Sequence, residues 1–590
     1  MKLSFPSFTQ WRAGVIAAIT RFPWNMLCGI TGTAALIVSI HTAHNDWLDG
    51  QCMRIAMASA LGMPLFFSLR MIRERIAKFA RWPIEIAGVA VLALWLWLMP
   101  SRPSIGPGII WIQWLLLLAA LHFVVAISPY FGGKENAGFW QFNRSLFLRF
   151  CLATLYTGIL TAGLELAMLS ANKLFQLKLG KEYGDLFFLM IGVFHPAFFL
   201  AGVPRDFRTL ESDVEYPRGL KAFTQFALAP LVAVYTAILY AYAVKIITLR
   251  SWPHGWVALP VLLLSGIGIL AFLLLYPLRR EPEQKWAGWF TNNFPRALGP
   301  LSILLLLSVL VRIREYGVTE ERYIGIVAAV WILAWALVFT LLRKSGIRWI
   351  PGSLAVIAFL AGFGPLSAGE ISKGSQLRRL EQMLKAHGMW KDNHAAPATA
   401  AIKLPEKEGK DLQTTLNYLI REHGGDTIKK MFESMLPYRD WTKMKSWEGA
   451  RDIVDALKVS TQDYFYGGIS VNRKPGIFLN TEGFRRIWRG NVYDTSSHWD
   501  PTSCEDVRIG LEDGVLKLAT GGDSTRQEVP LQHVFDRLES RKDGQLPDED
   551  LTVDFQNNSR AFRLTFESLT FRNGPEGIRL TSCELYLLEK

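Results

Sequence analysis

Apolar segments of about 20 residues recur through the first part of the sequence, and a helix of that length crosses the hydrocarbon core of a membrane. One segment alone would suit the buried core of a soluble protein, whereas a long series does not. The sequence therefore predicts an α-helical polytopic membrane protein, with about 11 transmembrane helices over residues 23–368. The segments are 23–41, 52–70, 82–99, 108–128, 146–170, 184–204, 220–244, 255–278, 296–312, 322–342 and 349–367.

The start of the chain is typical of a retained anchor. The first apolar segment is followed by polar residues that include His44 and Asp46, not by the small residues of a signal-peptide cleavage site. Residues 1–22 combine apolar, aromatic and basic side chains. We expect this segment to lie along the membrane interface on the cytoplasmic side.

The basic residues indicate the orientation in the membrane. The net charge of the chain is +13, of which residues 1–370 carry +14 and residues 371–590 carry −1. Alternate loops of the membrane part hold 21 and 9 Lys and Arg residues. The basic set, with 21, comprises 1–22, 70–81, 129–145, 205–221, 279–296 and 343–348. The alternate set, called charge-poor for its lower total of 9 basic residues, comprises 42–51, 100–107, 171–183, 245–254 and 312–322.

Basic loops stay on the cytoplasmic side of a membrane. The N-terminus is therefore expected inside, and an odd number of spans places the C-terminal domain outside the cytoplasm. In a bacterium with two membranes, this corresponds to an inner-membrane protein with a periplasmic domain. The positive charge is explained by topology, so no nucleic-acid partner is predicted.

The C-terminal part is predicted to be a soluble α+β domain. Residues 369–460 form a helical neck, in which Leu377, Leu380 and Leu384 share one helix face. Residues 461–590 alternate apolar and polar side chains and predict an antiparallel β-rich part, with a hairpin turn at Asp513-Gly514.

Two of the five cysteines lie in this soluble part, Cys504 and Cys583. A disulfide between them would suit an oxidising periplasm. Two unpaired buried thiols are the alternative, because sequence does not show whether the two residues are adjacent.

Several segments resemble a family of bacterial multi-pass membrane proteins known as domain of unknown function 4153. They are FWQFNRSLFLRF (139–150), FHPAFFLAGVPRDF (194–207), YPRGLKAFTQFALAPLVAVYTAILYAYAVKI (216–246), REYGVTEERY (314–323) and RWIPGSLAVIAFLAGFGPLSA (348–368). The resemblance implies a bacterial inner-membrane location and a multi-pass plan. The family has no agreed activity, so the resemblance implies no catalytic residue.

Ionisable residues inside apolar segments are costly and are candidates for function. Glu165 and Arg149 lie in the same segment, about 24 Å apart along a helix, so they do not pair directly. Arg149 is expected to extend to the interface, and Glu165 is a candidate for a structural or ion-coordinating role. His195-Pro196 lies mid-segment, where the proline kinks the helix and the imidazole either bonds a freed carbonyl or relays protons.

Two polar loops have simpler explanations. His41, His44 and Asp46 offer a weak metal-ligand pattern, and a solvated loop is the preferred interpretation, so no metal is predicted. Thr319 is expected to cap the tenth apolar helix, with Glu320 in its first turn.

No enzyme motif is present. The sequence lacks a Walker A loop, G-x-S-x-G, H-E-x-x-H and C-x-x-C. Gly266 and Gly268 lie inside an apolar segment and indicate helix packing, not a nucleotide loop. No catalytic residue or cofactor is predicted.

The preferred hypothesis is a non-enzymatic cell-envelope protein whose periplasmic domain binds a protein partner or senses the state of the envelope. The lipid bilayer is its other partner. One alternative is a transporter or channel-like protein for a small solute or ion. The other is a membrane-embedded transferase that acts on a lipid-linked substrate.

Overall fold

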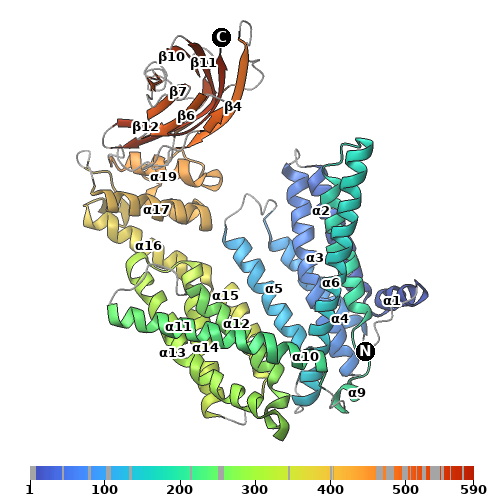
Figure 1. The fold of residues 1–590 in the computed structure, drawn as a ribbon. Coiled ribbons are helices and arrows are strands. Elements are labelled where there is room, and N and C mark those ends of the chain that lie inside the picture. Colours follow the sequence, from blue (N-terminus) through green and yellow to red (C-terminus); the bar gives the residue numbers. More distant parts are fainter. Residues whose placement is uncertain are drawn as a thin grey trace. The chain divides into compact units, whose positions relative to one another are not determined.

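The computed structural model contains a helical membrane part followed by further helices and antiparallel sheets (Figure 1). The chain divides into two compact units. The first comprises Met1–Ala386, Thr415–Met431 and Tyr438–Gly449, and the second comprises His387–Thr414, Phe432–Pro437 and Ala450–Lys590. The structure describes residues 8–42, 46–76, 81–100, 108–131, 136–212, 216–249, 258–342, 346–398, 402, 404–459, 469–473, 484–493, 502–504, 507–512, 515–520, 527–529, 531, 545–546, 551–557, 560–574 and 577–589.

Helices occupy every apolar segment that the sequence predicted to span the membrane. They are α1 (Phe8–Arg21), α2 (Pro23–His41), α3 (Asp46–Arg75), α4 (Arg81–Leu98), α5 (Ile109–Ile127), α6 (Asn136–Phe175), α7 (Glu182–Leu189), α8 (His195–Ala201), α9 (Phe207–Ser212), α10 (Arg218–Phe223), α11 (Ala229–Leu249), α12 (Ala258–Leu275), α13 (Lys285–Tyr316), α14 (Glu320–Leu341) and α15 (Trp349–Gly362). Two π-helical segments, η2 (Met190–Phe194) and η3 (Thr224–Leu228), join α7 to α8 and α10 to α11. Short 3-10 turns are η1 (Ser128–Tyr130), η4 (Pro277–Arg280) and η5 (Pro282–Gln284).

Within the described residues, nine helical stretches are long and apolar enough to cross a membrane. Two further apolar helices, Pro83–Leu98 and Trp349–Gly362, are shorter. The predicted multi-pass membrane class is confirmed, whereas the count of about 11 spans stays a prediction. The predicted segment 52–70 lies within a helical stretch that runs from Trp47 to Arg75 with Pro64 inside it.

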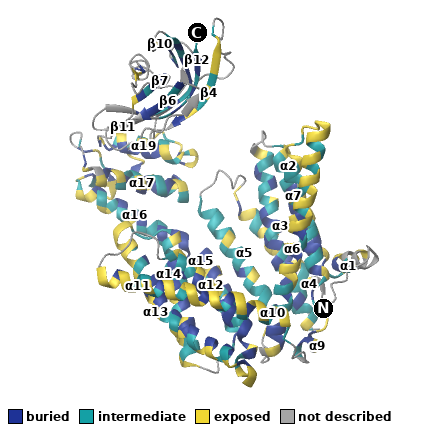
Figure 2. Cartoon of the chain, viewed as in Figure 1, coloured by how far each residue is buried: buried dark blue, intermediate teal, exposed yellow. Residues whose placement is uncertain are grey.

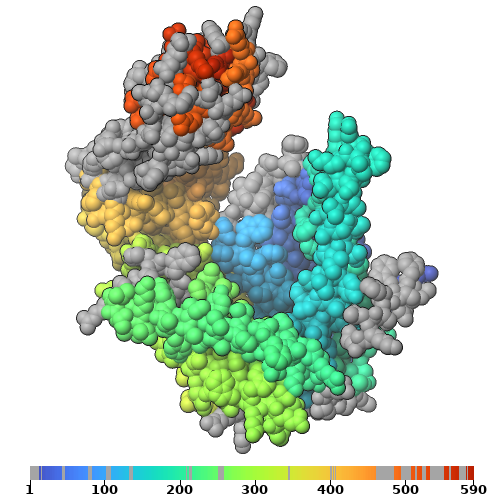
Figure 3. All heavy atoms as spheres, viewed as in Figure 1, coloured from blue at the N-terminus to red at the C-terminus, as the bar shows by residue number. Residues whose placement is uncertain are grey.

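Large apolar side chains are exposed along several of these helices. Figure 2 shows in yellow the exposed residues on parts of α6, α7 and α11. Ile159 and Leu166 on α6 and Ile247 on α11 are examples. Figure 3 shows α6 in teal and α11 in green on one face of this unit. Helices that expose apolar side chains in this way are suited to lipid rather than to water.

Both π-helical segments precede a proline. Proline lacks an N–H group and its ring clashes with the carbonyl group four residues earlier. For Pro196 and Pro230 those carbonyls belong to Gly192 and Phe226, which lie inside η2 and η3 respectively. The wider π turn accommodates the missing bond, so the kink expected at His195-Pro196 takes the form of a π segment.

The π segment η2 packs directly against α2. A Cβ atom on Gly29 would lie 2.4 Å from the carbonyl oxygen of Gly192, and a Cβ atom on Gly192 would lie 2.0 Å from Oγ1 of Thr33. These distances leave no room for a side chain. Small residues therefore allow the two backbones to approach closely, as is common between membrane helices.

Ion pairs connect several loops of the basic set at one end of the helices. The guanidinium of Arg21 donates to both oxygens of Glu74, at 3.1 and 2.7 Å, and to the carbonyl oxygens of Val203 and Pro204. Arg75 pairs with Glu211 at 2.6 Å. Loops predicted to lie on one side of a membrane thus meet at one end.

Among the described residues, the β-rich part of the second unit holds two sheets. The larger has the strand order β4-β12-β11-β3-β9, with β10 also pairing with β11, and the smaller has the order β5-β6-β7-β8. All pairings are antiparallel apart from β3 with β9. The strands are β3 (Ile469–Arg473), β4 (Arg486–Tyr493), β5 (Thr502–Cys504), β6 (Val507–Glu512), β7 (Val515–Thr520), β8 (Gln527–Glu528), β9 (Gln545–Leu546), β10 (Thr552–Asn557), β11 (Arg560–Gly574) and β12 (Gly577–Glu589).

The predicted β-rich part is confirmed, and alternation builds its core. Ile509 and Leu511 on β6 and Leu516 and Leu518 on β7 are buried and join one hydrophobic cluster with residues of β10, β11 and β12. Strands β6 and β7 pair with Glu512 opposite Val515, the register of the predicted hairpin. The residues Asp513-Gly514 fall outside the part of the chain that the structure describes.

Helices also form where the neck was predicted. They are α16 (Ala368–Ala386), α17 (Glu406–His423), α18 (Asp426–Phe432) and α19 (Ser446–Ala456), with a 3-10 turn η6 (Trp441–Lys443) and a short ladder of β1 (Trp390–Lys391) with β2 (His394–Ala395). On α16, Leu380 and Leu384 are buried, as the predicted helix face requires.

Candidate functional site

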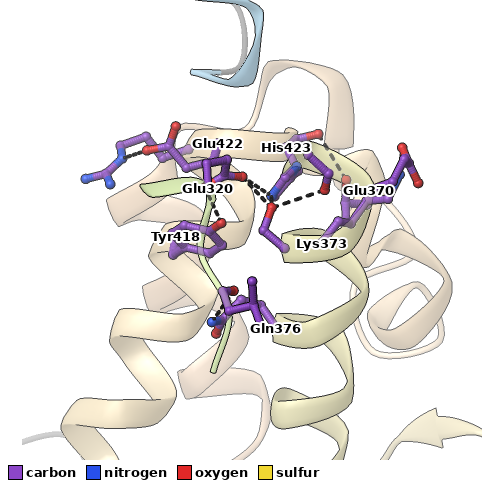
Figure 4. A network of polar contacts seen from close by, with 12 residues as sticks. Glu320, Glu370, Lys373, Gln376, Tyr418, Glu422 and His423 are labelled. Carbon is purple, nitrogen blue, oxygen red and sulfur yellow. Dashed lines mark hydrogen bonds and ion pairs between the residues drawn. The ribbon is translucent and has the colours of Figure 1, made fainter. Parts of the chain in front are cut away.

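A buried carboxylate at the start of α14 is the centre of a polar network within the first unit (Figure 4). The Glu320 side chain accepts a hydrogen bond from Ser372 Oγ on α16 at 2.6 Å and another from Tyr418 Oη on α17 at 2.5 Å. Nε2 of His423, the last residue of α17, lies 3.0 Å from the same carboxylate. Three helices therefore meet at one acidic group.

Water has little access to this network. Glu320 is 3% exposed, Ser372 is 0% exposed and the His423 side chain is 4% exposed. A buried carboxylate is tolerated only where hydrogen bonds and an opposite charge compensate for its lost hydration. The three donors around Glu320 supply that compensation.

Tyr418 is a protonated donor to Glu320. Burial raises the pKa of its phenol, and the hydrogen bond to Glu320 raises that pKa further. The phenol therefore keeps its proton at physiological pH and holds it toward the carboxylate. An exposed tyrosine has a pKa of about 10 and would lack this hydrogen bond to a buried carboxylate.

A second set of contacts fixes the loop that leads into α14. Nε2 of Gln376 donates to the carbonyl oxygens of Tyr316 and Val318 at 3.0 and 2.9 Å, and Val318 N donates to Ser375 Oγ at 3.0 Å. Gly317 ends α13 with a φ of 74°, and a Cβ atom there would lie 2.8 Å from Gln376 Nε2. Side chains of α16 thus fix the turn between α13 and α14 through hydrogen bonds to the backbone of that turn.

The network contains serine, histidine and glutamate, yet it is not arranged as a catalytic triad. In a triad, the serine and the acid bond to different nitrogens of the imidazole. Here Nε2 of His423 faces both Glu320, at 3.0 Å, and Ser372 Oγ, at 3.5 Å, and the serine donates directly to the acid. The geometry is suited to holding helices together and to sharing a proton between an imidazole and a carboxylate.

The comparison with known families matches the domain of unknown function DUF4153 over residues 29–387. The chain belongs to this family. It is 26% identical over 374 residues to the uncharacterised protein PM1469 of Pasteurella multocida (strain Pm70), a match that covers 62% of this chain and 61% of the relative. The match thus spans less than two thirds of that relative's length. No solved structure matches.

The DUF4153 match confirms the predicted resemblance and includes part of the polar network. Glu320 and Ser372 lie inside the matched region, whereas Tyr418 and His423 lie beyond it. Sequence reasoning placed Thr319 at the N-cap of α14 and Glu320 in its first turn. The structure places both residues there, but the Thr319 side chain makes no capping hydrogen bond. The partners of Glu320 are about 50 and 100 residues away, so local spacing gave no signal for the network.

The candidate residues predicted inside the membrane lie at separate places. His195 Nε2 is 3.2 Å from Thr154 Oγ1 on α6, and its ring meets Phe150 edge-on. Glu165 lies about 16 Å further along α6 than Thr154, so it does not reach His195. The stem of Arg149 packs on Gly202, where a Cβ atom would lie 2.6 Å from Arg149 Cδ. The structure does not bring these three residues together.

Of the three residues in the weak metal-ligand pattern, His41 is the one whose side chain the structure describes. His41 Nε2 lies 2.8 Å from Asp185 Oδ2 at the start of α7. His44 and the side chain of Asp46 are outside the described residues. Among the residues that are described, no group of three or more His, Cys, Asp or Glu side chains is placed to hold a metal ion.

Of the two cysteines predicted to form a disulfide, the structure describes the side chain of Cys583 alone. Cys583 on β12 is buried opposite Leu569 and Val492, and burial raises the pKa of its thiol. The side chain of Cys504, at the end of β5, is beyond what the structure describes. The disulfide stays a prediction.

Proposed function

We propose that this chain is a non-enzymatic protein of the bacterial inner membrane that carries its C-terminal β-rich domain into the periplasm, where the domain binds or senses an envelope component. The Glu320 network is the observation that supports this proposal. The network anchors α16 and α17, which follow the last apolar segment, to the N-terminal end of α14.

The network connects the exit of the chain to one identified loop. Helix α14 follows loop 312–322, which belongs to the charge-poor set. Because Ser372 bonds to Glu320, the chain leaves the membrane part at that same end. A second contact agrees, since Gly108 N at the start of α5 donates to Arg421 O at 3.1 Å and also follows a charge-poor loop. The positive-inside rule assigns charge-poor loops to the periplasm.

An orientation obtained only by counting helices reverses if one helix is miscounted. The contacts of Glu320 and Gly108 tie the C-terminal part to loops 312–322 and 100–107 directly. Loop 100–107 holds one Lys or Arg, whereas loop 312–322 holds three and is assigned to the periplasm by its place in the alternation of loops.

The β-rich unit has features of a binding domain. It has its own hydrophobic core, and β4 lies at an edge of the larger sheet, where Ile487 is 50% exposed. An edge strand presents unpaired backbone groups on which an extended partner segment adds as a further strand.

Reporter fusions test the orientation. Alkaline phosphatase fused after Lys590 is expected to be active, because the enzyme matures only in the periplasm, and the same fusion after Arg205 in a basic loop is expected to be inactive. A green fluorescent protein series should give the opposite pattern. Phosphatase activity after Arg205 and none after Lys590 would contradict the proposal.

Transport is the second candidate, and the π segment beside His195 is the observation that favours it, because π turns are frequent at functional sites. Transport predicts that His195→Ala or Glu165→Gln abolishes function in a strain that lacks the chromosomal copy, while the protein is still made and folded. Full complementation by both variants would exclude this candidate.

A further inference from the structure

A cavity of about 480 Å³ in the first unit is open to the surface, and no residue of the Glu320 network lines it. Its walls come from α5, α6, α12, α14 and α15. Small-molecule sites in proteins have volumes of about 300–1,000 Å³. The cavity is therefore large enough for a ligand.

The cavity runs from one end of the helices to their middle. Trp140 lies in the second turn of α6 and Ile347 precedes α15, and both fall within the predicted basic loops 129–145 and 343–348. Gly266 and Trp331 lie near the centres of α12 and α14. A depth of half a span corresponds to one leaflet of a bilayer, about 15 Å of hydrocarbon.

The walls offer almost no free hydrogen-bonding group. Trp140 Nε1 donates to Leu273 O at 2.7 Å, Asn143 Nδ2 donates to Ala126 O and Phe139 O, and Trp331 Nε1 donates to Ser353 Oγ at 3.0 Å. The remaining surface is mainly leucine, isoleucine and phenylalanine. Such a cavity holds water poorly, because water needs two to four polar partners.

One charged side chain stands at the wall. The guanidinium carbon of Arg144 lies 5.6 Å from the centroid of the Trp140 ring, in the half of the cavity near the basic loops. The cavity thus combines an apolar interior with a positive charge toward one membrane face. That combination matches an amphiphile with an anionic head and a hydrocarbon chain.

We propose that this cavity binds one acyl chain of an anionic phospholipid from the leaflet next to the basic loops, with the phosphate of the lipid near Arg144. The lining selects a hydrocarbon chain and the cationic side chain selects the head group. The surrounding bilayer supplies this ligand at high concentration.

A glycine in the wall provides the test. A Cβ atom on Gly266 would meet nothing within 4 Å, so Gly266→Phe is expected to fill the cavity without displacing a neighbour, and Gly266→Leu to fill part of it. The matched control is Gly163→Phe on α6, where a Cβ atom also meets nothing and where the cavity does not reach.

The full chain is purified in detergent, depleted of lipid, and offered phosphatidylglycerol, phosphatidylcholine or palmitate before native mass spectrometry. We expect the wild type and Gly163→Phe to retain phosphatidylglycerol, and Gly266→Phe to retain about tenfold less, equivalent to about 1.4 kcal/mol. Gly266→Leu should lie between them. Arg144→Gln should lose the preference for phosphatidylglycerol over phosphatidylcholine.

Three outcomes would overturn the proposal. They are equal lipid retention by folded Gly266→Phe, Gly266→Leu and wild-type protein, no retention of phosphatidylglycerol by the wild type, and retention of palmitate alone. Melting temperatures of the variants show that folding is preserved, and Gly266→Leu keeps the test informative if the phenylalanine variant fails to fold.

Discussion

At the scale of single residues, the position of a charge decides what it does. Glu320 and Glu321 are neighbours in the first turn of α14, yet Glu320 is buried among three donors and Glu321 is exposed. A helix N-terminus stabilises either carboxylate by a small amount. Only Glu320 also connects α14 to α16 and α17.

Glu320→Gln should destabilise the first unit by about 2–4 kcal/mol, because the neutral amide leaves the buried donors without a charged acceptor. Glu321→Gln is the matched control and should change stability by less than about 0.5 kcal/mol. Unfolding of the purified proteins in detergent, followed by circular dichroism, measures both. Equal stability of the two variants would remove the network as an anchor.

At the scale of helices and strands, repeated patterns were predictable and long-range partners were not. The length of the apolar segments predicted the membrane helices, and the alternation of apolar and polar residues predicted β6 and β7. Both patterns arise because each face of a segment must suit the lipid, water or protein core that surrounds it. A kink was predicted at Pro196, but the π segment that replaces it was not, and no irregularity was predicted before Pro230. The partners of Glu320 depend on how distant helices pack, which spacing within one segment does not contain.

Gly266 and Gly268 show this limit on a single helix. Both were predicted to serve helix packing, but only Gly268 is in close contact, since a Cβ atom there would lie 2.0 Å from Phe294 Cζ on α13. Gly266 faces the cavity instead.

Gly268→Ala should therefore cost about 1–3 kcal/mol of stability, because the added methyl group overlaps a buried ring and forces α12 away from α13. Gly266→Ala should be neutral, or slightly stabilising through its better helix propensity. Thermal unfolding of the two variants in the same detergent measures the difference. A larger loss for Gly266→Ala than for Gly268→Ala would contradict the assignment of the two faces of α12.

At the scale of the whole molecule, two separate hydrophobic cores stabilise the chain. One cluster contains membrane-helix residues such as Leu305 and Trp335, and the other contains β-strand residues such as Leu564 and Leu585. The two clusters share no residue. The charge of the sequence also differs between its two parts, but the compact units do not follow that boundary, because Thr415–Met431 and Tyr438–Gly449 belong to the first unit.

The two cores should respond to mutation independently. Leu564 and Leu305 are both 0% exposed, so Leu564→Ala and Leu305→Ala should each cost about 2–5 kcal/mol through lost burial and a residual cavity. We expect Leu564→Ala to lower the unfolding temperature of the β-rich unit alone, and Leu305→Ala to lower that of the membrane helices alone. Calorimetry of the full chain, with limited proteolysis to assign each transition, distinguishes the two. Mutations far apart with no shared partners are additive, so the double variant should show both shifts unchanged, and a single merged transition would mean that the units unfold as one.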